Sequence, residues 1–437
     1  MIPNLVVMIQ EFEQGCKYEI KTKTEEYSGV FVKQDEKFLY IKLKSGYNIG
    51  ISQNKIITTK KLEDKKTEKP KQDSKIATDK NLPQITILHT GGTIASKVDY
   101  STGAVIAQFT EKDILNLFPE LTTIANINSK LVRNMQSEMM RFAHYNLLAK
   151  AIKEEINKGT DGIIITQGTD TLHYTSAAMS FVLENLGIPV LIVGSQRSSD
   201  RPSSDAAINL ISAISFIANT DFSGVGVCMH DTDNDTTTQI LPGCKIRKMH
   251  TSRRDAFKPI NSKPIAQINT TKSEIKFLSE YSKKNKTKKI NLKLFKEDLK
   301  IGLIKPHISM FAEEILAYKN FDGVILELLG IGHMPTMKVD EYTDENIKIY
   351  EAIKTLCKKM PVGIAPTTIY GRLNLNVYSP GKQLLEAGVI GNYTDMTPET
   401  AFIKLSWLIS NYKKEEIKEL FEKNLQGEIS ERIEDEQ

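Results

Sequence analysis

The spacing of hydrophobic and polar residues divides the chain into regions of different character. Near the amino terminus, residues 26–34, 37–46 and 47–56 alternate between apolar and polar side chains, with turn residues between the segments. Such alternation is typical of strands that bury one face. We therefore expect residues 1–60 to form a small β-barrel.

Residues 61–83 have a different composition. They contain no aromatic residue and are dominated by lysine, aspartate and glutamate. A segment of this kind cannot bury enough apolar surface to offset the entropy that it would lose on ordering. We interpret it as a charged linker between the barrel and the rest of the chain.

After the linker, short apolar runs alternate with segments of helical period. Each run ends in glycine or a small polar residue, whereas residues 141–159 place their apolar side chains at helical spacing. Buried parallel strands that alternate with helices predict a layered α/β sheet, whose active site lies beyond the carboxyl ends of the strands. The runs are residues 85–92, 162–168, 190–195 and 224–231.

This pattern is interrupted after Thr271, where the sequence becomes basic and irregular. We interpret the irregular stretch as a connection between two α/β domains. The first is expected to span residues 84–290 and the second residues 300–425, and residues 426–437 are expected to form an acidic tail.

Composition excludes several classes of protein. Of the 437 residues, 40% are hydrophobic and 26% are charged, which is normal for a globular protein with a core. The formal net charge of +4 is too small to indicate nucleic-acid binding by the whole surface. The amino terminus lacks the basic region of a signal peptide, and no apolar run approaches the roughly 18–20 residues that span a membrane. None of the four cysteines forms a CxxC pair, so neither a disulfide framework nor a zinc ribbon is indicated. We expect a cytoplasmic protein with no membrane segment.

The function of the expected barrel stays open between two alternatives. Lysines beside aromatic residues are a pattern of RNA binding, but lysines on edge strands also prevent aggregation of a structural or protein-docking module. We favour the structural or docking interpretation. The residues concerned are Lys33, Lys37, Lys42 and Lys44, near Tyr40 and Tyr47.

Small polar residues follow two of the expected buried strands. Residues 90–96 are TGGTIAS and residues 166–172 are TQGTDTL. Paired glycines let a backbone approach a ligand closely, but they also form ordinary tight turns. A threonine beside an aspartate also commonly begins a helix. Each motif alone is therefore weak evidence, as are the polar segment 194–205 and the basic run 247–254.

Together, the two motifs resemble the two signatures of the asparaginase/glutaminase family of the bacterial type, in the right order. The resemblance covers about residues 84–425 and implies a two-domain, asparaginase-like layered α/β fold behind the small barrel. It also assigns roles to individual residues. Thr93 matches the first catalytic threonine, Tyr100 the tyrosine of a mobile loop, Ser137 and Glu138 a substrate-binding pair, and Thr169, Asp170 and Lys248 the second threonine with its acid and base partners.

The chemistry that this resemblance implies is consistent with the residue types. A threonine hydroxyl is a weak nucleophile and needs an adjacent base. Thr93 would be assisted by Tyr100, and Thr169 by Lys248, whose pKa burial would lower and Asp170 would partly restore. An acyl-enzyme would form, ammonia would leave, and water would complete the hydrolysis. Which threonine attacks first stays open, and no metal or organic cofactor is expected in this subunit.

Departures from the common bacterial enzymes indicate a narrower family. They are the amino-terminal barrel with its linker, Glu138 where those enzymes carry glutamine, and the basic stretch 250–257 after Lys248. These features resemble the D subunits of the archaeal glutamyl-tRNA(Gln) amidotransferases. The resemblance implies a glutaminase that supplies ammonia to a partner E subunit. That partner would use ATP and Mg, bind most of the Glu-tRNA(Gln) and convert it to Gln-tRNA(Gln).

The same resemblance implies a homodimeric core within a heterotetramer. Two other classes of function are weighed against it. One is a stand-alone cytosolic L-asparaginase, and the other is a catalytically silent scaffold or RNA-binding protein. Intact Thr93, Thr169, Asp170 and Lys248 argue against the silent scaffold, while the barrel and Glu138 argue against the free asparaginase.

Overall fold

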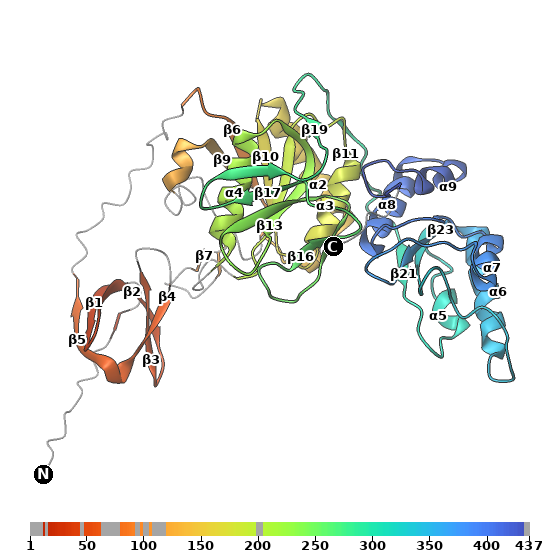
Figure 1. Cartoon of the computed structure of the whole chain (residues 1–437), viewed down its shortest axis with the longest axis horizontal. Helices are drawn as coiled ribbons and strands as arrows, with labels where there is room; N and C mark the ends of the chain where they lie inside the picture. The colour runs from red at the N-terminus through yellow and green to blue at the C-terminus, as the bar shows by residue number, and fades with distance from the viewer. Residues whose placement is uncertain are drawn as a thin grey trace, which may run out of the picture.

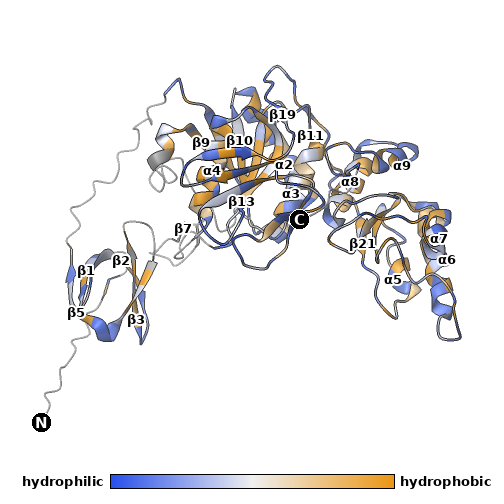
Figure 2. Cartoon of the chain, in the orientation of Figure 1, coloured by the Kyte–Doolittle hydropathy of each residue, from blue (hydrophilic) through white to orange (hydrophobic). Residues whose placement is uncertain are grey.

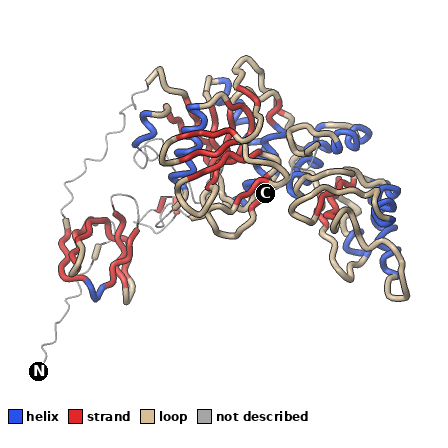
Figure 3. The backbone as a smooth tube through the Cα atoms, viewed as in Figure 1, coloured by secondary structure: helices blue, strands red, loops and turns tan. Residues whose placement is uncertain are grey.

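The computed structural model shows a small β domain followed by two α/β lobes (Figure 1; Figure 3 colours the same view by secondary structure). We call these the barrel, the amino-terminal lobe and the carboxy-terminal lobe. The structure describes residues 12–13, 16–43, 48–62, 79–91, 97–98, 105–106, 119–197 and 204–431.

The barrel is an antiparallel sheet with the strand order β4-β3-β2-β1-β5 and a core of its own. Alternation explains its packing, because Leu39 and Ile41 point into the core whereas Phe38 at the start of the same strand is 38% exposed. The strands are β1 (Lys17–Thr22), β2 (Glu26–Gln34), β3 (Phe38–Leu43), β4 (Asn48–Ser52) and β5 (Ile56–Lys61).

The amino-terminal lobe is built on a large sheet with the order β18-β17-β14-β13-β12-β10-β6-β9. The five strands from β13 to β9 are parallel neighbours, and β14, β17 and β18 extend the sheet in antiparallel fashion. They are β6 (Gln84–His89), β9 (Asn126–Leu131), β10 (Gly162–Thr166), β12 (Pro189–Val193), β13 (Phe222–His230), β14 (Thr237–Pro242), β17 (Ala266–Asn269) and β18 (Glu274–Phe277).

Helices cover both faces of this sheet, which is why central strands such as β10 and β12 consist almost entirely of buried apolar residues. Ile163 and Ile165 pack with α2 (Phe142–Asn157) and α3 (Leu172–Val182), whereas Ile164 between them packs with α4 (Ala206–Asn219) on the opposite face. Strands buried on both faces are expected in a parallel sheet. Figure 2 shows the resulting concentration of hydrophobic residues inside the lobe.

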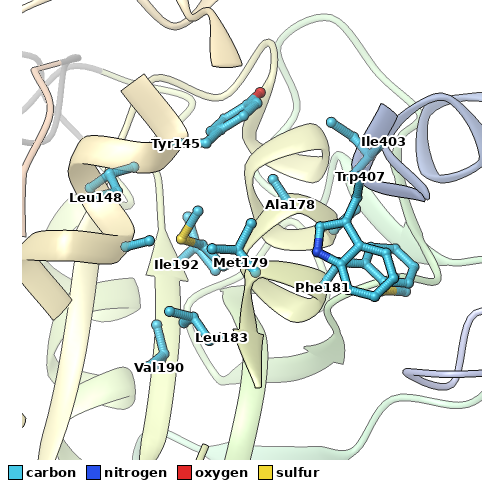
Figure 4. Packing of buried hydrophobic residues seen from close by; sticks show 14 of the residues in the cluster. Tyr145, Leu148, Ala178, Met179, Phe181, Leu183, Val190, Ile192, Ile403 and Trp407 are labelled. Atoms are coloured by element: carbon cyan, nitrogen blue, oxygen red, sulfur yellow. The ribbon is translucent and has the colours of Figure 1, made fainter. Parts of the chain in front are cut away.

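The carboxy-terminal lobe contains a parallel sheet of three strands, β21 (Ile301–Ile304), β22 (Gly323–Leu328) and β23 (Val362–Pro366). One of its helices, α8, packs against β22 and β23 and also against α3 of the amino-terminal lobe. Figure 4 shows this junction, where Trp407 of α8 meets Phe181 of α3 with ring centroids 5.4 Å apart. The helices are α5 (Ala312–Leu316), α6 (Asp344–Lys359), α7 (Ser379–Ala387), α8 (Pro398–Asn411) and α9 (Lys414–Glu422).

Two segments differ from what their composition suggested. The basic stretch after Thr271 is not a plain connection, because it contains β18, β19 (Ser282–Lys283) and β20 (Asn291–Leu292), which pair with strands of the amino-terminal lobe. These strands are short. β19 and β20 have two residues each and are mostly exposed, whereas β18 packs Ile275 and Phe277 against the core and was missed because it is only four residues long.

The second difference concerns the expected acidic tail. Residues 426–431 fold back onto the lobes, and Glu428 is fully buried in an ion pair with Lys404 of α8, with an Nζ–Oε1 distance of 2.6 Å. The acidic composition suggested a solvated segment, but the ammonium of Lys404 on α8 balances the charge of the buried Glu428 carboxylate. Residues 432–437 of the expected tail lie outside the described residues.

No helix in the described part of the chain is long and apolar enough to cross a membrane. All four cysteines lie in that part and carry free thiols.

Candidate active site

The two sequence motifs meet at the carboxyl ends of adjacent parallel strands. β6 lies between β9 and β10, and His89 at its end pairs in register with Thr166 at the end of β10. Beyond these strands, the backbone N–H and the hydroxyl of Thr90 both donate to the carbonyl of Thr166, at 3.1 and 3.0 Å. Because β9 and β10 lie on opposite sides of β6, this edge is a topological switch point, where ligands bind in such sheets.

Glycines allow the loops at this edge to pack closely. Gly91 has a φ of 99°, and a Cβ on it would lie 2.5 Å from the carbonyl oxygen of Met135. A Cβ on Gly194, after β12, would lie 2.8 Å from the methyl group of Thr169. A side chain at either position would push the neighbouring loop away, so Gly91 is required by the close approach to Met135 and Gly194 by the close approach to Thr169.

Three of the predicted catalytic residues form one connected group. Nζ of Lys248 lies 2.8 Å from Oγ1 of Thr169 and 2.7 Å from Oδ1 of Asp170. The Lys248 side chain is only 12% exposed, whereas that of Asp170 is 68% exposed. Lys248 ends β15 (Ile246–Lys248), which pairs with β16 (Phe257–Pro259) in a short hairpin beside the main sheet.

The predicted substrate-binding pair lies at the same edge. Ser137 and Glu138 begin the short 3-10 helix η4 (Ser137–Met139), in which Ser137 is buried and Glu138 is exposed. The hydroxyl of Thr171 donates to the Ser137 carbonyl at 2.6 Å. The TQGTDTL motif and the Ser137–Glu138 pair are therefore fixed relative to each other by a direct hydrogen bond.

The remaining two predicted site residues, Thr93 and Tyr100, lie outside the described residues. The chain leading to Thr93 is placed at the site by the Thr90 and Gly91 contacts with Thr166 and Met135. The roles predicted for Thr93 and Tyr100 therefore stay predictions.

Asp205 ends the polar segment 194–205, and the sequence pattern assigned it no role of its own. Its buried carboxylate accepts hydrogen bonds from the backbone N–H groups of Gln196 and Arg197, at 3.0 and 2.9 Å, and from the hydroxyl of Ser195 at 3.0 Å. Asp205 thereby orders the turn after β12, next to Thr169. Its position before the apolar helix α4 was the available signal, since aspartate is a common residue before a helix.

Family models match almost the whole chain. The model described as Asparaginase, N-terminal, matches residues 84–282, and the Glutaminase/Asparaginase C-terminal domain matches residues 300–421. The GatD N-terminal domain matches residues 12–62.

Curated relatives extend over the same length. The D subunit of glutamyl-tRNA(Gln) amidotransferase from Methanococcus maripaludis strain C7 is 44% identical over 429 residues, which cover 96% of this chain and 98% of the relative. The protein of the same name from Pyrococcus abyssi is 42% identical over 397 residues, covering 90% and 87%. The chain belongs to the D-subunit family of glutamyl-tRNA(Gln) amidotransferases. This assignment confirms the family that the motifs and the amino-terminal barrel predicted.

Solved structures confirm the expected fold for this member of the D-subunit family. The thermostable L-asparaginase from Thermococcus kodakarensis is 31% identical, with a TM-score of 0.68, and the similarity covers 80% of this chain and 100% of that structure. L-asparaginase I from Vibrio cholerae gives the same TM-score at 28% identity, covering 80% and 99%. The prediction of an asparaginase-like layered α/β fold behind a small β domain is therefore correct.

Nearby histidines of this D-subunit family member are suited to structural roles. Burial lowers the pKa of His89 to about 4, and its ring nitrogens lie 2.7 Å from Thr166 Oγ1 and 2.9 Å from Ser129 Oγ. Burial also lowers the pKa of His173 to about 4. Both rings are neutral near pH 7, and the basic side chain in contact with Thr169 is that of Lys248.

Proposed function

We propose that the chain hydrolyses glutamine through a threonine nucleophile and supplies the released ammonia to a partner subunit. The observation that carries the proposal is the position of Lys248 Nζ, within hydrogen-bond distance of both the Thr169 hydroxyl and the Asp170 carboxylate. A lysine held between a nucleophile and an acid can move a proton in both directions. Membership of the D-subunit family supports glutamine as the amide.

In the proposed reaction, a threonine Oγ attacks the side-chain amide carbon of glutamine, the C–N bond breaks, and the nitrogen leaves as ammonia after accepting a proton. Neutral Lys248 accepts the hydroxyl proton of Thr169, and Asp170 stabilises the ammonium that results. Such positioned proton transfer contributes roughly 10²–10⁴-fold in rate. Water then hydrolyses the acyl-enzyme ester.

Thr93 and Tyr100 are proposed to supply the other half of this chemistry. The order in which Thr93 and Thr169 react is left open by the proposal. Backbone N–H groups of the glycine-containing turns at this edge are the proposed donors to the oxyanion. No metal or organic cofactor has a part in the proposed steps of this subunit.

The family assignment makes the chain an amidohydrolase that acts as part of a glutamyl-tRNA(Gln) amidotransferase. We further propose a partner of the E-subunit type that uses ATP and Mg and binds most of the Glu-tRNA(Gln). We propose a homodimeric core within a heterotetramer, located in the cytoplasm.

A stand-alone L-asparaginase is the second candidate, because the similar solved structures carry that name. The match of residues 12–62 to the GatD N-terminal domain favours the amidotransferase component. The two candidates differ in their dependence on a partner and in their preferred amide.

The deciding experiment measures hydrolysis of glutamine and of asparagine by the full chain, alone and with an E-type subunit and Glu-tRNA(Gln). We expect glutamine to have the higher kcat/KM and its hydrolysis to increase when the partner and the tRNA are present. If asparagine is hydrolysed faster than glutamine, and neither the partner subunit nor the tRNA changes the rate, the chain is a stand-alone asparaginase instead.

A further inference from the structure

One segment of the carboxy-terminal lobe contacts β15, which carries Lys248, and the residues directly before it. This segment, residues 395–400, comprises the approach to α8 and its first turn. Asp395 forms an ion pair with Lys245, and Glu399 forms one with Arg247 at 3.0 Å. The hydroxyl of Thr400 donates to the carbonyl of Cys244 at 2.8 Å. The 395–400 segment thus holds β15 and the residues before it at successive positions leading to Lys248.

The helix that follows this segment also holds the other half of the candidate site. α8 packs against α3, which begins at Leu172, shortly after Thr169 and Asp170. Phe402 of α8 meets Tyr174 edge-on at 6.1 Å between ring centroids, and the Trp407–Phe181 contact lies further along the helix (Figure 4). One element of the carboxy-terminal lobe therefore contacts both the threonine–aspartate side and the lysine side.

The Lys245–Asp395 pair is built for a fixed geometry. Its side chains are 4% and 0% exposed. Lys245 also donates to Oγ of Ser430 at 2.8 Å, and the backbone N–H of Ser430 donates to Asp395 at 3.0 Å. Burying two charges contributes little net stability, because desolvation offsets their attraction. The best-attested use of such a pair is to fix the register of the elements that carry it.

We propose that Asp395 and Glu399 are positioning residues for Lys248. They fix β15 against α3, so that Lys248 Nζ stays within hydrogen-bond distance of Thr169 and Asp170. This inference rests on the proposed function, in which Lys248 is the base. On this proposal, the carboxy-terminal lobe sets the geometry of the site, although the candidate reactive groups that the structure describes all lie in the amino-terminal lobe.

The test uses the full chain with Asp395→Asn and Glu399→Gln, each of which removes one charge and keeps the shape of the side chain. We expect kcat for glutamine to fall about tenfold, because small misplacements of a catalytic group cost up to roughly 10²-fold. The KM should change much less, and the acid limb of the kcat–pH profile should shift, because the contact of Lys248 with Asp170 changes. Unchanged kcat and pH profile in both variants would overturn the proposal.

Glu155→Gln is the matched control. Glu155 is a buried carboxylate of α2 that pairs with Lys158 and lies near Thr86 and Thr160, at the amino ends of the strands. Its loss should lower the melting temperature and leave kcat unchanged. An equal fall in kcat for Glu155→Gln would show that the Asp395 effect is general destabilisation.

A double-mutant cycle separates this inference from the proposed function. If Asp395 acts through Lys248, Asp395→Asn in a Lys248→Ala background should be no slower than Lys248→Ala alone. Additive losses would overturn the positioning role, whereas near-native activity of Lys248→Ala would overturn the proposed function itself. If Asp395→Asn does not fold, Glu399→Gln is tested by the same criteria. Its partner Arg247 is 27% exposed, so loss of this ion pair leaves a charge that solvent can reach.

Discussion

The two lobes each contain a lysine that pairs with a carboxylate from another element, and the two pairs have opposite surroundings. Lys248 and Asp170 lie at the open edge of the large sheet, with side chains 12% and 68% exposed. Lys404 and Glu428 lie inside the carboxy-terminal lobe, and both are fully buried. The first pair is open to solvent, whereas the second pair is shielded from it.

The two lysines also differ in their hydrogen-bond partners. Lys404 donates to Glu428 and to the carbonyls of Phe421 and Lys423, at 2.6, 2.9 and 2.6 Å, so all three of its protons are used. Lys248 instead contacts one carboxylate and one hydroxyl that is itself proposed to react. The same two chemical groups thus stabilise the fold where solvent is excluded, and they are proposed to serve chemistry where solvent is admitted.

The largest effect is expected at the exposed pair. Lys248→Ala, Asp170→Asn and Thr169→Val should each lower glutaminase kcat by roughly 10²–10⁴-fold, the usual contribution of positioned proton transfer. Thr93→Val should behave in the same way. Steady-state glutamine hydrolysis and circular dichroism of the same samples check the loss and the retained fold. A folded Lys248→Ala variant with near-native turnover would show that the Thr169–Asp170–Lys248 assignment is wrong.

These four variants also test the separation of the two reactions. In complex with the partner, they should still amidate Glu-tRNA(Gln) when ammonium is supplied, because only ammonia needs to pass between the sites. Failure of amidation in a folded complex with added ammonium would contradict that separation.

The buried pair should affect stability and leave chemistry unchanged. Lys404→Met leaves a buried carboxylate without its partner, which typically costs roughly 3–5 kcal/mol. Lys348→Met is the matched control in the same lobe, because Lys348 is 69% exposed and pairs with Glu345 on the surface of α6; exposed pairs contribute roughly 0–1 kcal/mol. Urea unfolding measures both. Equal losses of stability in the two variants would remove the contrast between buried and exposed pairs.

The sequence predicted the parts of the molecule in which local pattern and structure coincide. Runs such as residues 163–165 are buried on both faces, so their hydrophobicity alone indicated central parallel strands. Thr169 and Asp170 follow such a strand, and the family motif located them and Lys248. Strands β19 and β20 were missed because two exposed residues show no alternation. Strand β18 does alternate, with Ile275 and Phe277 packed against the core, but its four residues lie in a stretch dominated by basic residues.

The local sequence pattern could not predict contacts between residues that lie far apart along the chain. Lys245 and Asp395 are 150 positions apart, and Lys404 pairs with a residue of the segment that composition suggested was a solvated tail. Thr397 signals the start of α8, since its hydroxyl accepts from the N–H of Thr400, but nothing local indicates that this helix start contacts β15. The sequence therefore predicted the candidate reacting groups, but not the contacts that are proposed to position them.

A smaller effect is expected from His89, a buried titratable group at the end of β6. Its pKa of about 4 is below the ordinary value of 6.5, because burial disfavours the charged ring. Between these values the unfolded chain binds a proton that the folded chain does not, so stability is fully present above pH 6.5 and declines as the pH falls towards 4. Urea midpoints at neutral and acidic pH should show a weaker decline in His89→Gln, whose amide can still bond to Thr166 and Ser129. An identical decline in wild type and variant would exclude His89 as a contributor.

The smallest effect is expected at Glu138, the other exposed carboxylate of the candidate site. Glu138 lies beside Ser137, whose carbonyl accepts a hydrogen bond from Thr171 of the threonine motif, so residue 138 lies at the end of the sheet where substrate is proposed to bind. A charged pair with the α-ammonium of glutamine is stronger than the neutral hydrogen bond that Glu138→Gln would leave. Because exposed ion pairs contribute roughly 0–1 kcal/mol, the KM for glutamine should rise by at most about fivefold, with kcat little changed. Asparagine is one methylene shorter, a difference worth only about 1–3 kcal/mol in an apolar pocket, so the variant is also expected to discriminate less between the two amides.

The measurement is kcat/KM for both amides in wild type, Glu138→Gln and the exposed control Glu351→Gln on α6, whose side chain is 61% exposed. Unchanged constants in Glu138→Gln would place its carboxylate outside the substrate site, and the barrel would then be the principal feature that separates this chain from a free asparaginase.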